Sequence, residues 1–243
     1  MNAHYYEEDL AYIHHVGFSA LAHEASPWIV SKLRRAGIKK GTIVELGCGG
    51  GVLLAALTAA GYETLGIDAS APILDIASKT APAATLVHAS LYEVPLPRCA
   101  AVIAMGEGLN YVTETDAPPN TPELFARIAA ALDSNGLFLF DVITRGRDAN
   151  RSYRSWAAGP DWACLVETIP EPDGCHLRRA ITTFRSVDGS SYRRGHEEHR
   201  VYLFSRVQLQ SQLKEAGFRV STAHAYGPVP LAPGRSLFIC RRG

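Results

Sequence analysis

The stretch "TIVELGCGGGVLLAAL", residues 42–57, decides the fold of this chain. An apolar run that contains one acid, Glu45, leads into a turn with four glycines among residues 47–51. A helix-like apolar pattern follows at once. A strand, a glycine-rich turn and a helix form the unit that brings a nucleotide-like ligand against open backbone. The stretch therefore predicts a ligand-binding α/β unit.

The spacing of the glycines indicates which ligand the turn would hold. A dinucleotide-binding turn reads G-x-G-x-x-G, and its third glycine lets the helix pack closely. Gly47 and Gly49 fit this pattern, but Val52 stands in the third place. The acid Glu45 precedes the first glycine by two residues, where it would repel a pyrophosphate and suit a ligand with a cationic end. Asp68 follows 21 residues after Gly47, at the end of the next strand, where a carboxylate can accept hydrogen bonds from both ribose hydroxyls.

From residue 42 to 143, short β-rich runs alternate with helical patterns. The β-rich runs are almost continuously apolar, which is typical of a parallel sheet with helices on both faces. Thr121 is expected to cap the third helix, and Gly61 and Gly136 stand where helices should stop. Strands are expected at 42–46, 63–68, 84–90, 100–105 and 136–143, and helices at 50–60, 71–78 and 122–132.

Residues 145–204 break this alternation. Three strand-like runs are separated by "PEPDG" and "DGS", which are hairpin signals. The segment therefore predicts an antiparallel insertion on the main sheet. The α/β pattern resumes at Ser205, which forms a capping box with Gln208. The first forty residues have a helical pattern, so they are expected to form helices before the first core strand.

Composition excludes several classes of protein. The chain has 243 residues and a formal net charge of zero, so no long-range field favours nucleic acid or an anionic membrane. The five cysteines are odd in number and have no C-x-x-C spacing, which argues against a disulfide framework and a zinc site. With no signal peptide and no apolar run of about 20 residues, a cytoplasmic location is expected.

Five motifs together resemble the class I S-adenosylmethionine-dependent methyltransferases of the small-molecule type. They are "VELGCGGG", "LGIDAS", "ASLYEVPLP", "AAVIAMGEGLNYV" and "LFARIAAALDSNGLFLFDV", in this order along the chain. The resemblance implies an α/β fold with a Rossmann-like seven-stranded sheet and helices on both faces. It also implies three parts: an N-terminal helical lid (1–40), a cofactor-binding core (41–144 and 205–243) and an antiparallel β insertion after the fifth strand (145–204) as a substrate cap.

The resemblance also assigns S-adenosyl-L-methionine as cofactor, with S-adenosyl-L-homocysteine as product. The glycine turn would lie against the methionine part of the cofactor, Glu45 would hold its amino end, and Asp68 would bind the ribose. Ser90 stands where many members carry an acid for the adenine amino group, and it has the alternative role of capping a strand end. The residues expected at the cofactor are Tyr12, Glu45, Gly47, Cys48, Gly49, Asp68, Ala69, Ser90, Leu91, Met105 and Gly106.

Methyl transfer from a sulfonium needs alignment and desolvation rather than a metal. A hydroxyl or ammonium acceptor also needs a general base, for which the candidates are His14, Tyr111 and Glu107. The expected acceptor is an oxygen or nitrogen atom of a small molecule, with no nucleic-acid or membrane partner, and the protein is expected to be a monomer or homodimer. Two alternatives stay open: a methyltransferase of tRNA or protein, and a nicotinamide-dependent Rossmann oxidoreductase.

Overall fold

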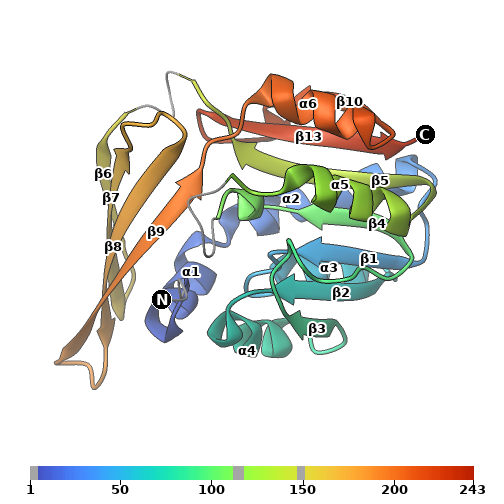
Figure 1. Cartoon of the computed structure of the whole chain (residues 1–243). Coiled ribbons are helices and arrows are strands. Elements are labelled where there is room, and N and C mark those ends of the chain that lie inside the picture. The colour runs from blue at the N-terminus through green and yellow to red at the C-terminus, as the bar shows by residue number, and fades with distance from the viewer. Residues whose placement is uncertain (1–4, 112–117, 147–150) are drawn as a thin grey trace.

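The computed structural model describes residues 5–111, 118–146 and 151–243 (Figure 1). The first four residues of the expected lid, Val112 of the fourth motif and residues 147–150 of the insertion lie outside this description. No helix of the described residues is long and apolar enough to cross a bilayer.

The core is a seven-stranded sheet with the strand order β10-β13-β5-β4-β1-β2-β3. The strands β1 to β5 run parallel to one another, and β13 runs antiparallel to both of its neighbours. All six residues of β4 are buried, because helices cover both faces. The strands are β1 (Thr42–Leu46), β2 (Glu63–Asp68), β3 (Thr85–His88), β4 (Cys99–Ala104), β5 (Leu132–Ile143), β10 (Phe218–Ala223) and β13 (Arg235–Arg242). The predicted α/β fold class is confirmed.

Two hydrophobic clusters form the core, one on each face of the sheet. One cluster includes stacked aromatic rings of the central strands, among them Phe140 and Phe238, whose centroids lie 4.8 Å apart. The other includes Ile29 and Leu53 from helices on the opposite face. The helices are α1 (Glu8–Phe18), α2 (Ala20–Arg35), α3 (Val52–Ala59), α4 (Ala71–Thr80), α5 (Thr121–Ala131) and α6 (Arg206–Glu215), with a short 3₁₀ helix, η1 (Gly108–Asn110).

Two predicted boundaries near α5 are wrong. The N-cap is Asn120 rather than Thr121, because the Asn120 side chain accepts the hydrogen bond from the Glu123 amide. The strand β5 begins at Leu132 rather than Gly136, because Leu132 is already extended and pairs with Cys99. The register then shifts before the next pairs, so the turn residues that resembled a helix stop form an irregularity inside the strand.

A second, four-stranded antiparallel sheet stands beside the core (Figure 1). It consists of β6 (Tyr153–Ala158), β7 (Trp162–Pro170), β8 (His176–Ser186) and β9 (Tyr192–Tyr202). The helix α1 lies between this sheet and the core, where Leu10 and Ile13 pack against Trp162 and Ile181. A small ladder, β11 (Ala225–Tyr226) with β12 (Val229–Pro230), precedes β13. The second sheet and α1 together therefore cover the edge of the core sheet at which its parallel strands end.

Candidate active site

Two adjoining cavities lie where the parallel strands end, which is the edge at which ligands bind in open α/β sheets. The narrower cavity, of about 140 Å³, lies over the ends of β2 and β3. The wider one, of about 370 Å³, lies over the glycine turn and α2. The two cavities share six lining residues, so they form two parts of one site. The shared residues are Tyr6, His14, Gly47, Gly49, Met105 and Gly106.

The backbone of the glycine turn is held by Asp68. One carboxylate oxygen accepts from the Gly49 amide at 2.9 Å and the other from the Ser70 amide at 3.0 Å. Burial raises the pKa of Asp68, and these two bonds oppose that shift. Because a carboxylate has about four acceptor positions, the side chain keeps the capacity to bind two hydroxyl groups in the narrow cavity that it lines. It therefore shapes the turn and is placed to bind a ligand as well.

Glu45 is buried at the end of β1 and lines the wide cavity. Its oxygen Oε2 has no hydrogen-bond partner among the described residues. Burial raises the pKa of Glu45 well above its ordinary value, and the neighbouring Asp68 adds to this shift. A buried carboxyl oxygen without a partner is costly, so this oxygen fits a donor, above all a cationic one, that a ligand brings into the cavity.

Gly51 shows why the turn needs glycine. Its φ is +79°, and a Cβ built there would lie 3.1 Å from the Cα of Ala77 in α4. The left-handed conformation keeps Gly51 outside the helix. The helix α3 therefore begins at Val52, two residues later than predicted. The bare turn thus serves close packing against α4 as well as the cavity.

The remaining residues expected at the cofactor, apart from Tyr12, also line the cavities. Ala69, Ser90 and Leu91 line the narrow one, and Cys48 lines the wide one. The Ser90 hydroxyl accepts from the Tyr92 amide at 3.2 Å, so it caps the strand end and still has a hydroxyl hydrogen to donate.

The loop after β4 is held by a buried acid, Asp141 of β5. Its carboxylate accepts from the amides of Gly106 and Glu107, at 2.8 and 3.2 Å, and from the hydroxyl of Tyr226 at 2.6 Å. Glu107 adopts a left-handed φ of +62°. These bonds fix Met105 and Gly106 as the surface between the two cavities.

Glu107 is neutralised by two arginines from other strands. Arg179 of β8 pairs with both carboxylate oxygens, at 2.7 and 3.3 Å, and Arg235 of β13 lies 3.1 Å from one of them. Burial raises the pKa of Glu107, but Arg179 and Arg235 outweigh it and hold the pKa below its ordinary value. The carboxylate is therefore ionised but fully occupied, which makes it a poor general base.

His14 and Tyr111 both line the narrow cavity. Burial and the neighbouring His15 lower the pKa of His14 to about 4, so its ring is neutral at pH 7. The Nδ1 atom of His14 has no hydrogen-bond partner among the described residues. Burial raises the pKa of Tyr111, whose hydroxyl lies 2.7 Å from that of Tyr6. His14 is the one of the three candidates with a free, neutral nitrogen.

The structure does not place Tyr12 at the cavities. Its hydroxyl donates to Asp161 at 3.0 Å, and the guanidinium of Arg185 lies 3.2 Å from its ring centroid. The helix α1 turns this side chain toward the second sheet, and Tyr6 lines both cavities instead. The backbone of Tyr6 is tied on both sides, because its amide donates to Glu197 and its carbonyl accepts from Ser70.

Sequence reasoning missed Tyr6, Arg179, Arg235 and Asp141. A signal existed only for Asp141, since it is a lone acid inside the apolar run "GLFLFDVI". The two arginines come from strands far apart in the sequence, so only the fold brings them to Glu107.

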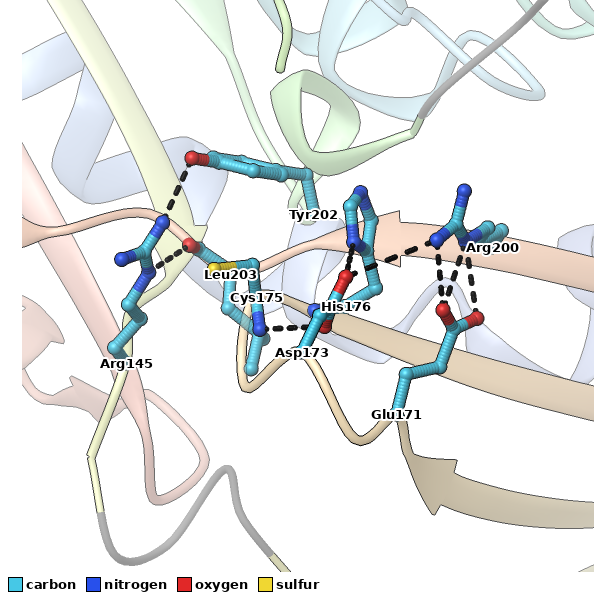
Figure 2. Close-up of polar contacts among 8 residues, drawn as sticks. All are labelled: Arg145, Glu171, Asp173, Cys175, His176, Arg200, Tyr202 and Leu203. Atoms are coloured by element: carbon cyan, nitrogen blue, oxygen red, sulfur yellow. Dashed lines mark hydrogen bonds and ion pairs between the residues drawn. The ribbon is translucent and has the colours of Figure 1, made fainter. Parts of the chain in front are cut away.

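One group of possible metal ligands lies outside the cavities, at the turn between β7 and β8 (Figure 2). Glu171, Asp173 and His176 offer ligand atoms within 4.8 Å of one another. However, Arg200 pairs with Glu171 at 2.7 Å and His176 Nδ1 lies 2.6 Å from Asp173. These contacts already balance the two carboxylates, so the group fits a structural role in the hairpin.

Comparisons with known proteins agree with this geometry. A family model described as a methyltransferase domain matches residues 18–223. A candidate methyltransferase of Geobacillus sp. (strain WCH70) is 28% identical over 197 residues, which cover 76% of this chain and 76% of that protein.

Solved structures share the fold. An S-adenosylmethionine-dependent methyltransferase of Clostridium acetobutylicum ATCC 824 has a TM-score of 0.80 and 17% identity, with 96% of each chain covered. SAM-bound CalS10, an amino pentose methyltransferase of Micromonospora echinaspora, has a TM-score of 0.75 and 17% identity, with 98% of each chain covered.

Proposed function

Since this chain belongs to the methyltransferase domain family, we propose that it transfers a methyl group from S-adenosyl-L-methionine to an oxygen or nitrogen atom of a small molecule. The observation that carries the proposal is the pair of acids beside the glycine turn, the buried Glu45 and the half-buried Asp68. Asp68 keeps acceptor capacity in the narrow cavity, and Glu45 has an unpartnered oxygen in the wide one. Family membership also removes the nicotinamide-dependent alternative.

The residues present suit each part of this cofactor. In our proposal, Asp68 binds the ribose hydroxyls, while Ala69, Ser90 and Leu91 enclose the adenine in the narrow cavity. Glu45 and the turn at residues 47–49 hold the amino acid end in the wide cavity. The likeness to SAM-bound CalS10 supports this choice of cofactor.

The bound cofactor supplies an already activated methyl group, so the protein's contribution is alignment and exclusion of water. Met105 and Gly106 lie between the two cavities, which makes them the floor beside the transferred methyl group. His14 lines both cavities with a neutral ring, so we assign it as the group that accepts the acceptor's proton, and its pKa of about 4 makes it a weak base. Glu107, with its two arginines, holds the loop after β4 in place rather than exchanging protons.

The covered site supports a small acceptor. The helix α1 and the second sheet close over the strand ends, so we assign residues 1–40 as a lid and residues 145–204 as a substrate cap. CalS10, which shares the fold, is described as an amino pentose methyltransferase, and a pentose is a small molecule. The described cysteines are all free thiols, which supports a reducing cytoplasmic location.

Binding of S-adenosyl-L-homocysteine, measured by isothermal titration calorimetry, tests the proposal. The wild-type protein should bind this product, and Asp68→Ala should weaken binding by about 100-fold, since two hydrogen bonds to a charged group are worth about 3 kcal/mol. Asp75→Ala is the control, because Asp75 is an exposed acid on the neighbouring helix α4. Its affinity should equal that of the wild type.

Asp68→Asn separates binding from folding, because its amide oxygen can still accept one of the backbone bonds. A folded Asp68→Asn protein should bind the product more weakly than the wild type does. The proposal fails if the wild-type protein binds neither S-adenosyl-L-methionine nor its product.

A further inference from the structure

An open cleft of about 670 Å³ lies beside the wide cavity, at the end of β5 and the start of β13, and shares Arg235 with it. Its described lining contains three arginines and one histidine, namely Arg145, Arg206, Arg235 and His224, but no aspartate or glutamate. Adjacent positive charges with no acid between them repel one another. A cleft of this size and composition fits an anion.

Two of these arginines have no carboxylate partner among the described residues. Arg145 donates to the carbonyl of Leu203 at 2.9 Å and to the hydroxyl of Tyr202 at 2.8 Å (Figure 2). Both acceptors are neutral, so they fix the guanidinium without cancelling its charge. Arg200, in the same view, pairs instead with the carboxylate of Glu171. Arg206 is exposed and forms no ion pair within the described chain. The charges of Arg145 and Arg206 are therefore left for a ligand.

The N-terminus of α6 borders the same cleft, because Ser205, Arg206 and Val207 line it. Arg206 is the first residue of this ten-residue helix, and Ser205 is its N-cap, with its side chain accepting from the Gln208 amide. The first amides of a helix have no intrahelical partner and carry a partial positive charge. This adds to the field of the three arginines.

Arg235 connects the cleft to the active site, because it lines both the cleft and the wide cavity and contacts Glu107. We propose that the methyl acceptor carries an oxyanion group, a phosphate or a carboxylate, which Arg145 and Arg206 bind in this cleft. The acceptor then extends past Arg235 toward Met105 and Gly106. This inference rests on the proposed methyl transfer and narrows its substrate class to anionic small molecules.

The test is a titration of the full-length protein, saturated with S-adenosyl-L-homocysteine, with pyrophosphate, inorganic phosphate and acetate at low ionic strength. Calorimetry should detect binding of at least one of these probes, and comparing them tells a phosphate from a carboxylate group. Arg206→Gln and Arg145→Gln should each weaken that binding by about 10-fold, as expected for the loss of one charge-assisted contact. Arg194→Gln is the control, because Arg194 is an exposed arginine of β9 outside the cleft.

Each outcome decides the proposal. Arg145→Gln can also loosen the chain around Leu203, so the exposed Arg206 gives the cleaner variant. Arg206→Gln should bind the product as tightly as the wild type does. If the wild-type protein fails to bind the product, the methyltransferase function itself is refuted. If the wild type binds the product but none of the three anions, or if Arg206→Gln and Arg194→Gln bind anions equally well, the anion cleft is refuted and the methyltransferase function stands.

Discussion

The two halves of the active site differ in whether arginine side chains pair with their acids. On the glycine-turn side, Glu45 and Asp68 have raised pKa values because of burial, and the described residues supply no ion pair to either. On the side of the loop after β4, Glu107 is held by Arg179 and Arg235. Glu45 and Asp68 are therefore left with unused acceptor capacity, whereas Glu107 in the second half is saturated.

This difference shows where a ligand is needed. A buried carboxyl group without a partner lowers stability, so it is retained where a bound molecule supplies the missing donor. A paired carboxylate contributes a fixed geometry, which suits a loop that must hold its shape while other molecules come and go. The glycine-turn side is thus organised for binding and the β4-loop side for positioning.

Removing an arginine partner of Glu107 should have the largest effect on stability. Arg179→Met removes the bidentate partner of buried Glu107, and loss of one partner of a buried pair costs about 3 kcal/mol. Arg178→Met is the matched control on the same strand, because Arg178 pairs with Glu198 at an exposed position and should contribute less than about 1 kcal/mol. Urea unfolding measures both variants, and equal losses would contradict the distinction.

The glycine turn should be the next most sensitive feature. Gly51→Ala combines a left-handed φ with a close contact to Ala77, so we expect a loss of about 2 kcal/mol. Gly61→Ala separates the two causes, because Gly61 also has a positive φ but a Cβ there would meet nothing within 4 Å. Its loss of unfolding free energy should be about 1 kcal/mol. If Gly61→Ala lowers the free energy of unfolding more than Gly51→Ala does, packing of Gly51 against α4 is unimportant.

In the ligand-free protein, Glu45→Gln should raise the free energy of unfolding, whereas the two preceding substitutions lower it. The folded pKa of Glu45 is raised above its ordinary 4.5, so its ionisation lowers stability as the pH rises from 4.5 through the folded pKa. The amide cannot ionise, so the variant should be more stable than the wild type at pH 8, yet bind S-adenosyl-L-homocysteine more weakly.

The pH dependence of Glu107 runs the other way, which provides the contrast for Glu45. Its folded pKa is lowered, so its contribution is present above pH 4.5 and is lost as the pH falls through the folded pKa. Urea titrations of wild type, Glu45→Gln and Glu107→Gln from about pH 2.5 to 8 measure both slopes, because the Glu107 slope lies below pH 4.5. Slopes of the same sign for the two acids would remove the contrast between the two sides.

Tyr12→Phe should have the smallest effect. Its hydroxyl donates to Asp161 in the turn between β6 and β7, so its loss should lower stability by less than about 1 kcal/mol and leave product binding within twofold of the wild type. Tyr6→Phe is the comparison, since Tyr6 lines both cavities and its hydroxyl meets that of Tyr111. A stronger effect of Tyr12→Phe on binding would restore the original expectation for that residue.

Much of the core could be predicted because its signals are local. The strands at 42–46 and 63–68 were placed to the residue by their apolar runs, and glycine spacing located the turn between them. Boundaries failed where a local signal competed with sheet pairing, as at Gly136, which resembles a helix stop but lies inside β5. The expectation for Tyr12 was wrong because the sequence alone does not tell whether Tyr12 of α1 or Tyr6, which precedes this helix, lines the cavity.

The sequence by itself determined the α/β core, the bare turn and the two acids beside it, because each depends on residues within a few positions of one another. Only the tertiary structure decided that Glu107 is saturated, that Glu45 is not, and that Arg145, Arg206 and Arg235 meet in one cleft. These facts depend on which strands become neighbours, and the charge balance of a buried group is set by neighbours in space rather than along the chain.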